Sequence, residues 1–136
     1  MKFKFVKDLT SDVVFEAYGK SLKEVFENAA LALFNVICKI ERVKTTQQKV
    51  IEVSGNDASD LMFNWLQELI GIVDTDGIFL SKFVVNELDE KHLRATVYGE
   101  RADPRKGGTV VKAVTYYKFR LERGGKGYKV TAALDI

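Results

Sequence analysis

The sequence has 136 residues, a length typical of one domain, and 46% of them are hydrophobic and 29% charged, which excludes a disordered chain. The formal net charge is +2, from 21 basic and 19 acidic residues, so overall charge does not indicate a nucleic-acid-binding protein. One cysteine and one histidine cannot form an internal disulfide or a zinc or iron–sulfur centre. Neither a secretory signal nor an apolar segment of membrane-spanning length is visible, so we expect one cytoplasmic domain over residues 1–136.

The first third of the chain predicts two strands followed by a helix. Residues 2–7 alternate charged and apolar side chains, and residues 13–17 repeat this period of two. Ser21 opens an S-x-x-E capping box, which marks the start of a helix. Apolar residues then recur every three or four positions as far as Ile37, as on one helical face. Cys38 follows this pattern and is predicted to be a small core residue rather than a reactive thiol.

The middle of the chain predicts a further strand and a second helix. Val50, Ile51 and Val53 favour a strand that ends at Ser54-Gly55. Either Asn56 or Asp57 can cap the following helix, whose apolar face runs from Leu61 to Val73. After it, the sequence Asp-Thr-Asp-Gly of residues 74–77 predicts a turn.

The rest of the chain predicts two β-hairpins. Residues 78–88 pair with residues 93–99, and residues 110–121 pair with residues 128–134. The order of elements is therefore typical of an α+β fold of two layers, with two helices packed on a largely antiparallel sheet.

A search for catalytic motifs finds no P-loop, no dinucleotide-binding glycine pattern and no hydrolase or metalloprotease signature. His92 lies in a predicted hairpin turn and is expected to be a surface residue. The basic loop of residues 101–108 is expected to be solvated. We therefore expect that the protein is not an enzyme, although a small metal-dependent hydrolase or nuclease is an alternative.

Three carboxylates form the one candidate site. Asp135 is followed by Ile136, which carries the terminal α-carboxylate, and Asp12 begins a strand that could lie beside them. Such a group would be repulsive unless a cation bound it, and oxygen ligands favour Ca²⁺ or Mg²⁺. The alternative is that Asp135 and Ile136 form a frayed tail.

Five segments resemble those of the archease family. They are the first helical region, residues 17–35, the second helix, residues 57–69, the turn Gly99-Glu100 before the basic loop, the strand of residues 111–117, and the ending Leu-Asp-Ile, residues 134–136. The chain differs from the usual family motifs at two places, because Leu9 and Tyr117 stand where histidines are common.

The resemblance implies a duplicated strand–helix–strand–strand fold, called SHS2-like, and a metal site formed by Asp12, Asp135 and the α-carboxylate of Ile136. The expected ion is divalent, Ca²⁺ first and Mg²⁺ or Mn²⁺ as alternatives. The first motif of the family usually begins with an acidic residue, and Asp8 stands at that position. Asp8 and Lys112 are candidates for contact with a partner or with phosphate.

The function that the resemblance implies is that of a non-enzymatic activator of an RtcB-type tRNA-splicing RNA ligase. It would promote guanylylation of the ligase by GTP and multiple turnover. The alternative is a chaperone-like binding module for a tRNA-modifying enzyme, such as a tRNA cytosine methyltransferase. Contact with tRNA itself is expected to be weak or indirect, and no membrane partner is expected.

Overall fold

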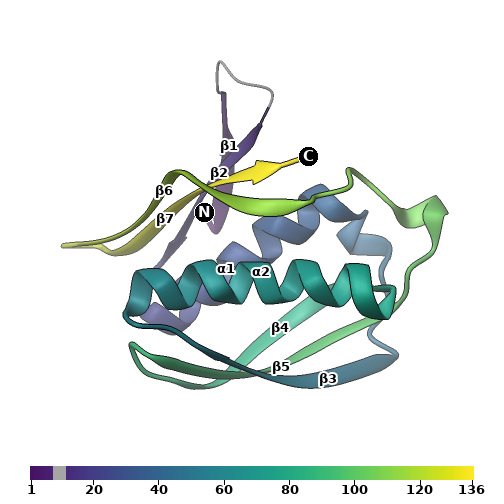
Figure 1. Cartoon of the computed structure of the whole chain (residues 1–136), viewed down its shortest axis with the longest axis horizontal. Helices are drawn as coiled ribbons and strands as arrows, with labels where there is room; N and C mark the ends of the chain where they lie inside the picture. The colour runs from purple at the N-terminus through teal and green to yellow at the C-terminus, as the bar shows by residue number, and fades with distance from the viewer. Residues whose placement is uncertain (8–11) are drawn as a thin grey trace.

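The computed structural model describes residues 1–7 and 12–136, and its two α-helices lie between two antiparallel sheets (Figure 1). The helices are α1 (Leu22–Ile37) and α2 (Ala58–Asp76). The four-stranded sheet has the order β1-β2-β7-β6 and consists of β1 (Phe3–Val6), β2 (Val13–Gly19), β7 (Gly127–Asp135) and β6 (Ala113–Gly124). The three-stranded sheet has the order β3-β5-β4 and consists of β3 (Gln47–Ser54), β5 (His92–Arg101) and β4 (Ile78–Leu88).

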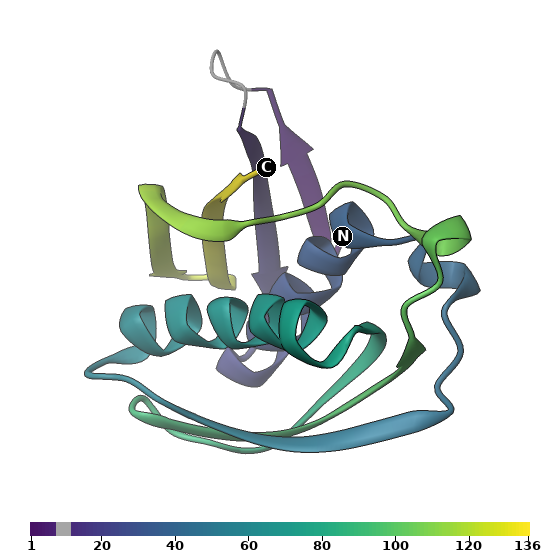
Figure 2. The ribbon, with the colours of Figure 1, turned by 45° about the vertical axis from the view of Figure 1, so that its right-hand side comes forward.

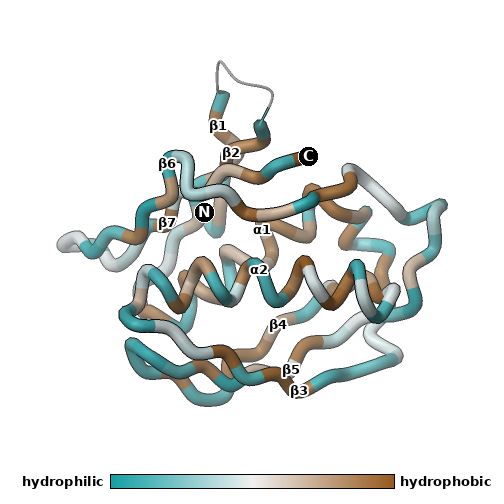
Figure 3. The backbone as a smooth tube through the Cα atoms, viewed as in Figure 1, coloured by the Kyte–Doolittle hydropathy of each residue, from teal (hydrophilic) through white to brown (hydrophobic). Residues whose placement is uncertain are grey.

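This arrangement confirms the predicted α+β class with helices on antiparallel strands, and it adds the division of the strands into two sheets. Helix α1 packs against β2 of one sheet and β4 of the other, and α2 packs against β6, β3 and β4. Each helix therefore buries a wide apolar arc rather than a single narrow stripe. Figure 3 shows hydrophobic residues recurring along both helices, whereas the ends of the hairpins are mostly hydrophilic.

The start of α1 follows the predicted capping box, with one shift. Ser21 Oγ accepts a hydrogen bond from the amide of Glu24 at 3.2 Å. The carboxylate of Glu24 accepts in return from the amide of Lys20 at 3.3 Å, one residue before the cap. Both bonds occupy groups at the helix start that would otherwise lack a partner.

Helix α2 is capped by Asp57, whose Oδ1 accepts from the amide of Asp60 at 2.8 Å. The prediction of a turn at residues 74–77 is wrong for its first three residues, because α2 continues through Asp76. The chain leaves the helix at Gly77, which has the left-handed φ of +65° that glycine adopts without strain. Aspartate and threonine are compatible with a last helical turn that faces solvent, so only the glycine marked the end.

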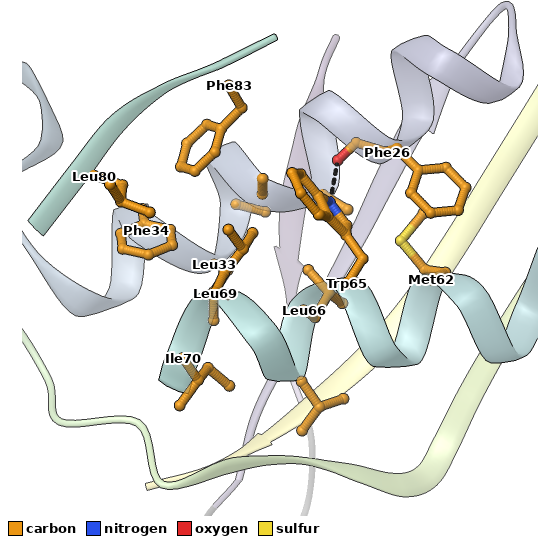
Figure 4. Packing of buried hydrophobic residues seen from close by; sticks show 14 of the residues in the cluster. Phe26, Leu33, Phe34, Met62, Trp65, Leu66, Leu69, Ile70, Leu80 and Phe83 are labelled. Atoms are coloured by element: carbon orange, nitrogen blue, oxygen red, sulfur yellow. Dashed lines mark hydrogen bonds between the residues drawn. The ribbon is translucent and has the colours of Figure 1, made fainter. Parts of the chain in front are cut away.

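The two helices meet in the centre of the core, where Trp65 of α2 is fully buried. Its indole nitrogen donates a hydrogen bond to the backbone oxygen of Phe26 at 3.0 Å (Figure 4). Cys38 is buried at the end of α1, and burial raises the pKa of its thiol to about 12. The prediction of an inert core cysteine is confirmed.

The sequence predicted that the basic loop of residues 101–108 is solvated. The structure corrects this prediction, because the loop covers the end of α1. The amides of Gly108 and Thr109 donate to the backbone oxygens of Ile37 and Val36, each at 2.8 Å. These bonds satisfy carbonyl groups that the helix leaves open at its end. Lys106 is partly buried, and its Nζ lies 2.8 Å from a carboxylate oxygen of Glu100.

Within residues 1–7 and 12–136, no helix is long and apolar enough to cross a membrane.

Candidate functional site

Three strand ends meet at one end of the four-stranded sheet. Here β7 finishes beside the start of β2, with Val13 opposite Leu134, and beside the start of β6, with Ala113 opposite Asp135. The amide of Lys112 donates to the backbone oxygen of Asp135 at 2.7 Å and extends this pairing by one residue. Figure 2 shows the C-terminus next to the β1–β2 hairpin. Segments from both ends of the chain therefore converge on this edge.

The pairing places two of the predicted ligands at neighbouring positions. Asp12 directly precedes Val13, so it stands at the register position of Asp135. Leu134 is fully buried, and side chains alternate along a strand, so Asp135 lies on the opposite face, away from the helices. Asp135 is a paired residue of β7, so the alternative of a frayed tail is wrong for it. Ile136, the next residue, has a side chain 41% exposed.

The oxygen atoms at this edge are ligands that a hard cation prefers, because Asp12 and Asp135 both supply carboxylate oxygens. Among residues 1–7 and 12–136, no group of three or more histidine, cysteine, aspartate or glutamate side chains could hold a metal ion. A bound cation would thus need further oxygen ligands, and the predicted α-carboxylate of Ile136 is one such group. Asp8 lies outside the described residues, as does Leu9. The side chain of Lys112 is exposed beside this edge.

The end of the sheet that carries Asp12 and Asp135 is here called the carboxylate edge, and β6 is tied to α2 just after it passes this edge. Gln67 Oε1 of α2 accepts a hydrogen bond from the amide of Val114 at 2.6 Å. This bond uses an edge-strand amide and holds the start of β6, and with it the partner of Asp135, against the helix. The sequence did not indicate this role, because a single glutamine within a helix does not show which backbone group its side chain will bond.

Beyond Thr115, β6 leaves its regular pairing and rejoins β7 only at Arg120. The strand pattern of residues 110–121 did not indicate this bulge. Lys118 within it has a φ of +58°, which is unusual for a residue with a side chain. Tyr116 turns toward α2 and stacks on Phe63, with ring centroids 4.2 Å apart, yet remains 78% exposed.

The signal that could have revealed the bulge is the adjacent pair Tyr116-Tyr117. Neighbouring residues of a regular strand face opposite sides, whereas here both tyrosines are exposed. Tyr117, at the position where the family motif has histidine, is 44% exposed. This aromatic segment begins three residues after Ala113, so it borders the carboxylate edge.

His92 is an exposed residue at the start of β5, in the other sheet, as the sequence predicted. Its Nδ1 lies 3.6 Å from Oδ1 of Asp89, and both side chains are about 70% exposed. The amides of Lys91 and His92 donate to Asp89 Oδ1, and they lower the pKa of that carboxyl group. This group stabilises a hairpin turn and has no part in the carboxylate edge.

Known proteins match this chain over nearly its whole length. The model of the Archease protein family matches residues 3–136. The protein archease of Sulfurisphaera tokodaii is 37% identical over 139 residues, and the match covers 99% of each chain. The chain belongs to the archease family. The solution structure of Methanobacterium thermoautotrophicum protein 1598 superposes with a TM-score of 0.82 at 35% identity, over 99% of each chain.

A second solved structure has the same fold at lower identity. It is the crystal structure of an archease from Thermotoga maritima, described as a possible chaperone, with a TM-score of 0.71 and 23% identity. That match covers 96% of the present chain and 95% of the other. In this archease chain, residues 111–117 and 134–136, which carry the family resemblance, meet Asp12 at a single end of one sheet.

Proposed function

We propose that this archease is an accessory protein that activates a partner enzyme, and that the partner is an RtcB-type tRNA-splicing RNA ligase. The observation that carries the proposal is the convergence of Asp12, Asp135 and two family-typical segments at the carboxylate edge. Family membership supports the choice of partner, because archeases are expected to promote guanylylation of this ligase.

The carboxylate edge would act as the contact point, with a divalent cation held by Asp12, Asp135 and the α-carboxylate of Ile136. Oxygen ligands of this kind suit Ca²⁺, with Mg²⁺ or Mn²⁺ as alternatives. The cation would offset most of the repulsion between the three carboxylates, and a coordination position that they leave open could take a phosphate oxygen of the partner's nucleotide. Lys112, the residue just before β6, adds an exposed ammonium group placed for a phosphate or an acidic side chain of the partner.

Cation binding can be measured on the archease alone. Calorimetric titration with Ca²⁺ is expected to give a saturable signal with the natural protein and to lose it with Asp135→Asn. Glu90→Ala is the matched control, because Glu90 is an exposed carboxylate in the β4–β5 turn of the other sheet. If Ca²⁺, Mg²⁺ and Mn²⁺ all fail to bind, the metal part of the proposal is wrong.

The functional test is single-turnover guanylylation of an RtcB-type ligase from the same organism, with and without this archease, at several Ca²⁺ and Mg²⁺ concentrations. The natural protein is expected to accelerate guanylylation, and Asp12→Ala or removal of Ile136 is expected to abolish the acceleration. Glu90→Ala is expected to behave as the natural protein does. Acceleration that survives both changes at the carboxylate edge would rule out that edge as the contact point.

A chaperone-like role on a tRNA-modifying enzyme, such as a tRNA cytosine methyltransferase, is the second candidate. The exposed apolar residues Tyr116 and Val110, which are 78% and 76% exposed, favour it. The description of the Thermotoga maritima relative as a possible chaperone points the same way. In this case the protein would suppress aggregation of the methyltransferase without any divalent cation, and Tyr116→Ser would impair that effect while Asp12→Ala would not.

A further inference from the structure

The end of the four-stranded sheet opposite the carboxylate edge contains an open pocket of about 530 Å³. It lies where β2 ends at Gly19 and where the glycine-rich turn of residues 124–127 joins β6 to β7. A Cβ atom on Gly127, which has a φ of +124°, would come within 2.3 Å of the backbone oxygen of Gly19. The turn is therefore packed directly on the β2–α1 connection, which defines two walls of the pocket.

The side chains around this pocket are predominantly basic. Four are basic, namely Lys20, Arg123, Lys126 and Lys129, and two are acidic, namely Glu24 and Glu122. Four basic against two acidic side chains give the lining a formal net charge of +2, which equals that of the whole chain. A concave surface on which basic side chains outnumber acidic ones attracts anionic ligands.

Both carboxylates of the pocket already have partners. Glu122 lies 3.5 Å from Arg120 Nε and 3.6 Å from Lys129 Nζ. The carboxylate of Glu24 accepts from the amide of Lys20. By contrast, the ammonium groups of Lys20 and Lys126 have no carboxylate within 4.0 Å among the residues that the structure describes.

The planar guanidinium of Arg123 lies beside the ammonium groups of Lys20 and Lys126 in this pocket, and it indicates which anionic ligand the pocket would bind. The guanidinium of Arg123 lies over the ring of Tyr128, with its carbon 5.7 Å from the ring centroid, and Tyr128 is half-buried. A guanidinium supported on an aromatic ring is a surface on which nucleobases stack, while lysines bind phosphate. The volume lies in the range of pockets that bind small molecules.

We propose that this pocket binds the phosphate and base of a nucleotide, with Lys20 and Lys126 on the phosphate and Arg123 stacked on the base. The nucleotide is either free or at the end of an RNA strand. The inference does not depend on the partner proposed above, because the pocket and the carboxylate edge lie at opposite ends of the same strands.

The test is a titration of ¹⁵N-labelled full-length protein with AMP, adenosine and inorganic phosphate, followed through the amide signals of Gly124, Gly125 and Gly127. AMP is expected to shift these signals saturably and to bind at least about tenfold more tightly than adenosine or phosphate, since only AMP engages both parts of the pocket. Lys126→Glu is expected to weaken AMP binding about tenfold. Lys91→Glu is the matched control, because Lys91 is an exposed lysine in the other hairpin turn, and it is expected to change the affinity less than twofold.

A 5′-phosphorylated adenylate trimer distinguishes a free nucleotide from the end of an RNA strand as the natural ligand. Binding of the trimer more tightly than AMP would assign the end of an RNA strand, and equal or weaker binding would assign a free nucleotide. The proposal is overturned if AMP shifts none of the three glycine signals, if Lys126→Glu and Lys91→Glu weaken binding equally, or if adenosine or phosphate binds as tightly as AMP. Thermal unfolding of each variant confirms that it is folded before it is titrated.

Discussion

Replacing Trp65 by phenylalanine is expected to lower the free energy of unfolding by about 2 kcal/mol. The indole is fully buried between α1 and α2, and it donates a hydrogen bond of 3.0 Å to the backbone oxygen of Phe26. Loss of that bond contributes about 1 kcal/mol. The missing ring leaves a void of roughly 40 Å³, which contributes about another 1 kcal/mol at ~24 cal/mol per Å³.

The assay is urea unfolding followed by circular dichroism at 222 nm, because the variant has no tryptophan fluorescence. For a chain of this length, a loss of about 2 kcal/mol corresponds to a decrease in Tm of roughly 6–8 °C. Incorporation of benzothienylalanine at position 65 is the control, since it keeps the shape of indole and removes only the N–H. It is expected to cost about 1 kcal/mol. A phenylalanine variant that loses less than about 0.5 kcal/mol would refute this account of the core.

Three further changes test other parts of the structure. Gly77→Ala forces a side chain into a left-handed conformation and is expected to cost about 1 kcal/mol by urea unfolding, whereas Gly77→Asn is expected to cost less. Gln67→Met leaves the amide of Val114 without its acceptor and is expected to cost about 1–3 kcal/mol; an unchanged midpoint would show that this bond is unimportant. Glu100 has its pKa lowered by a hydrogen bond from Lys106, so its stabilising effect is present above pH 4.5, its ordinary pKa, and is lost as pH falls through the lower folded value. The stability difference between the natural protein and Glu100→Gln should therefore shrink as unfolding is measured from pH 6 to pH 3, and a constant difference would contradict the ion pair.

The carboxylate edge and the nucleotide pocket give the four-stranded sheet two ends of opposite chemistry. Asp12 and Asp135 stand at the start of β2 and the end of β7, while Gly19 and Gly127 stand at the other ends of the same strands. An antiparallel pair in register brings both sets together at once, because each strand carries one member of each set. The two proposals can therefore be tested by separate substitutions in one protein.

Local patterns in the sequence were sufficient for most of the elements. Ser21 was recognisable as a helix cap, and the second cap was narrowed to Asn56 or Asp57, because the side chains of these residue types bond to nearby amides without help from the rest of the fold. The structure chose Asp57. Strand alternation and helical spacing identified the buried faces for a similar reason, since they depend only on the geometry of one element. The carboxylate candidates Asp12, Asp135 and Ile136 came from charge and family resemblance, and the pairing of β2 with β7 brings Asp12 and Asp135 to one place.

Tertiary structure alone decided how the strands divide between two sheets and where regular structure breaks. Partner choice between strands depends on packing around both helices, which join residues distant in the sequence, such as Trp65 and Phe26. The bulge after Thr115 and the docking of Gly108 on the end of α1 likewise need partners outside their own segment. The sequence by itself determined the order and type of the helices and strands, the cap of α1 and the buried faces, because these follow from neighbours along the chain. The sheet order, the bulge and the basic pocket depend on contacts that exist only once the chain has folded.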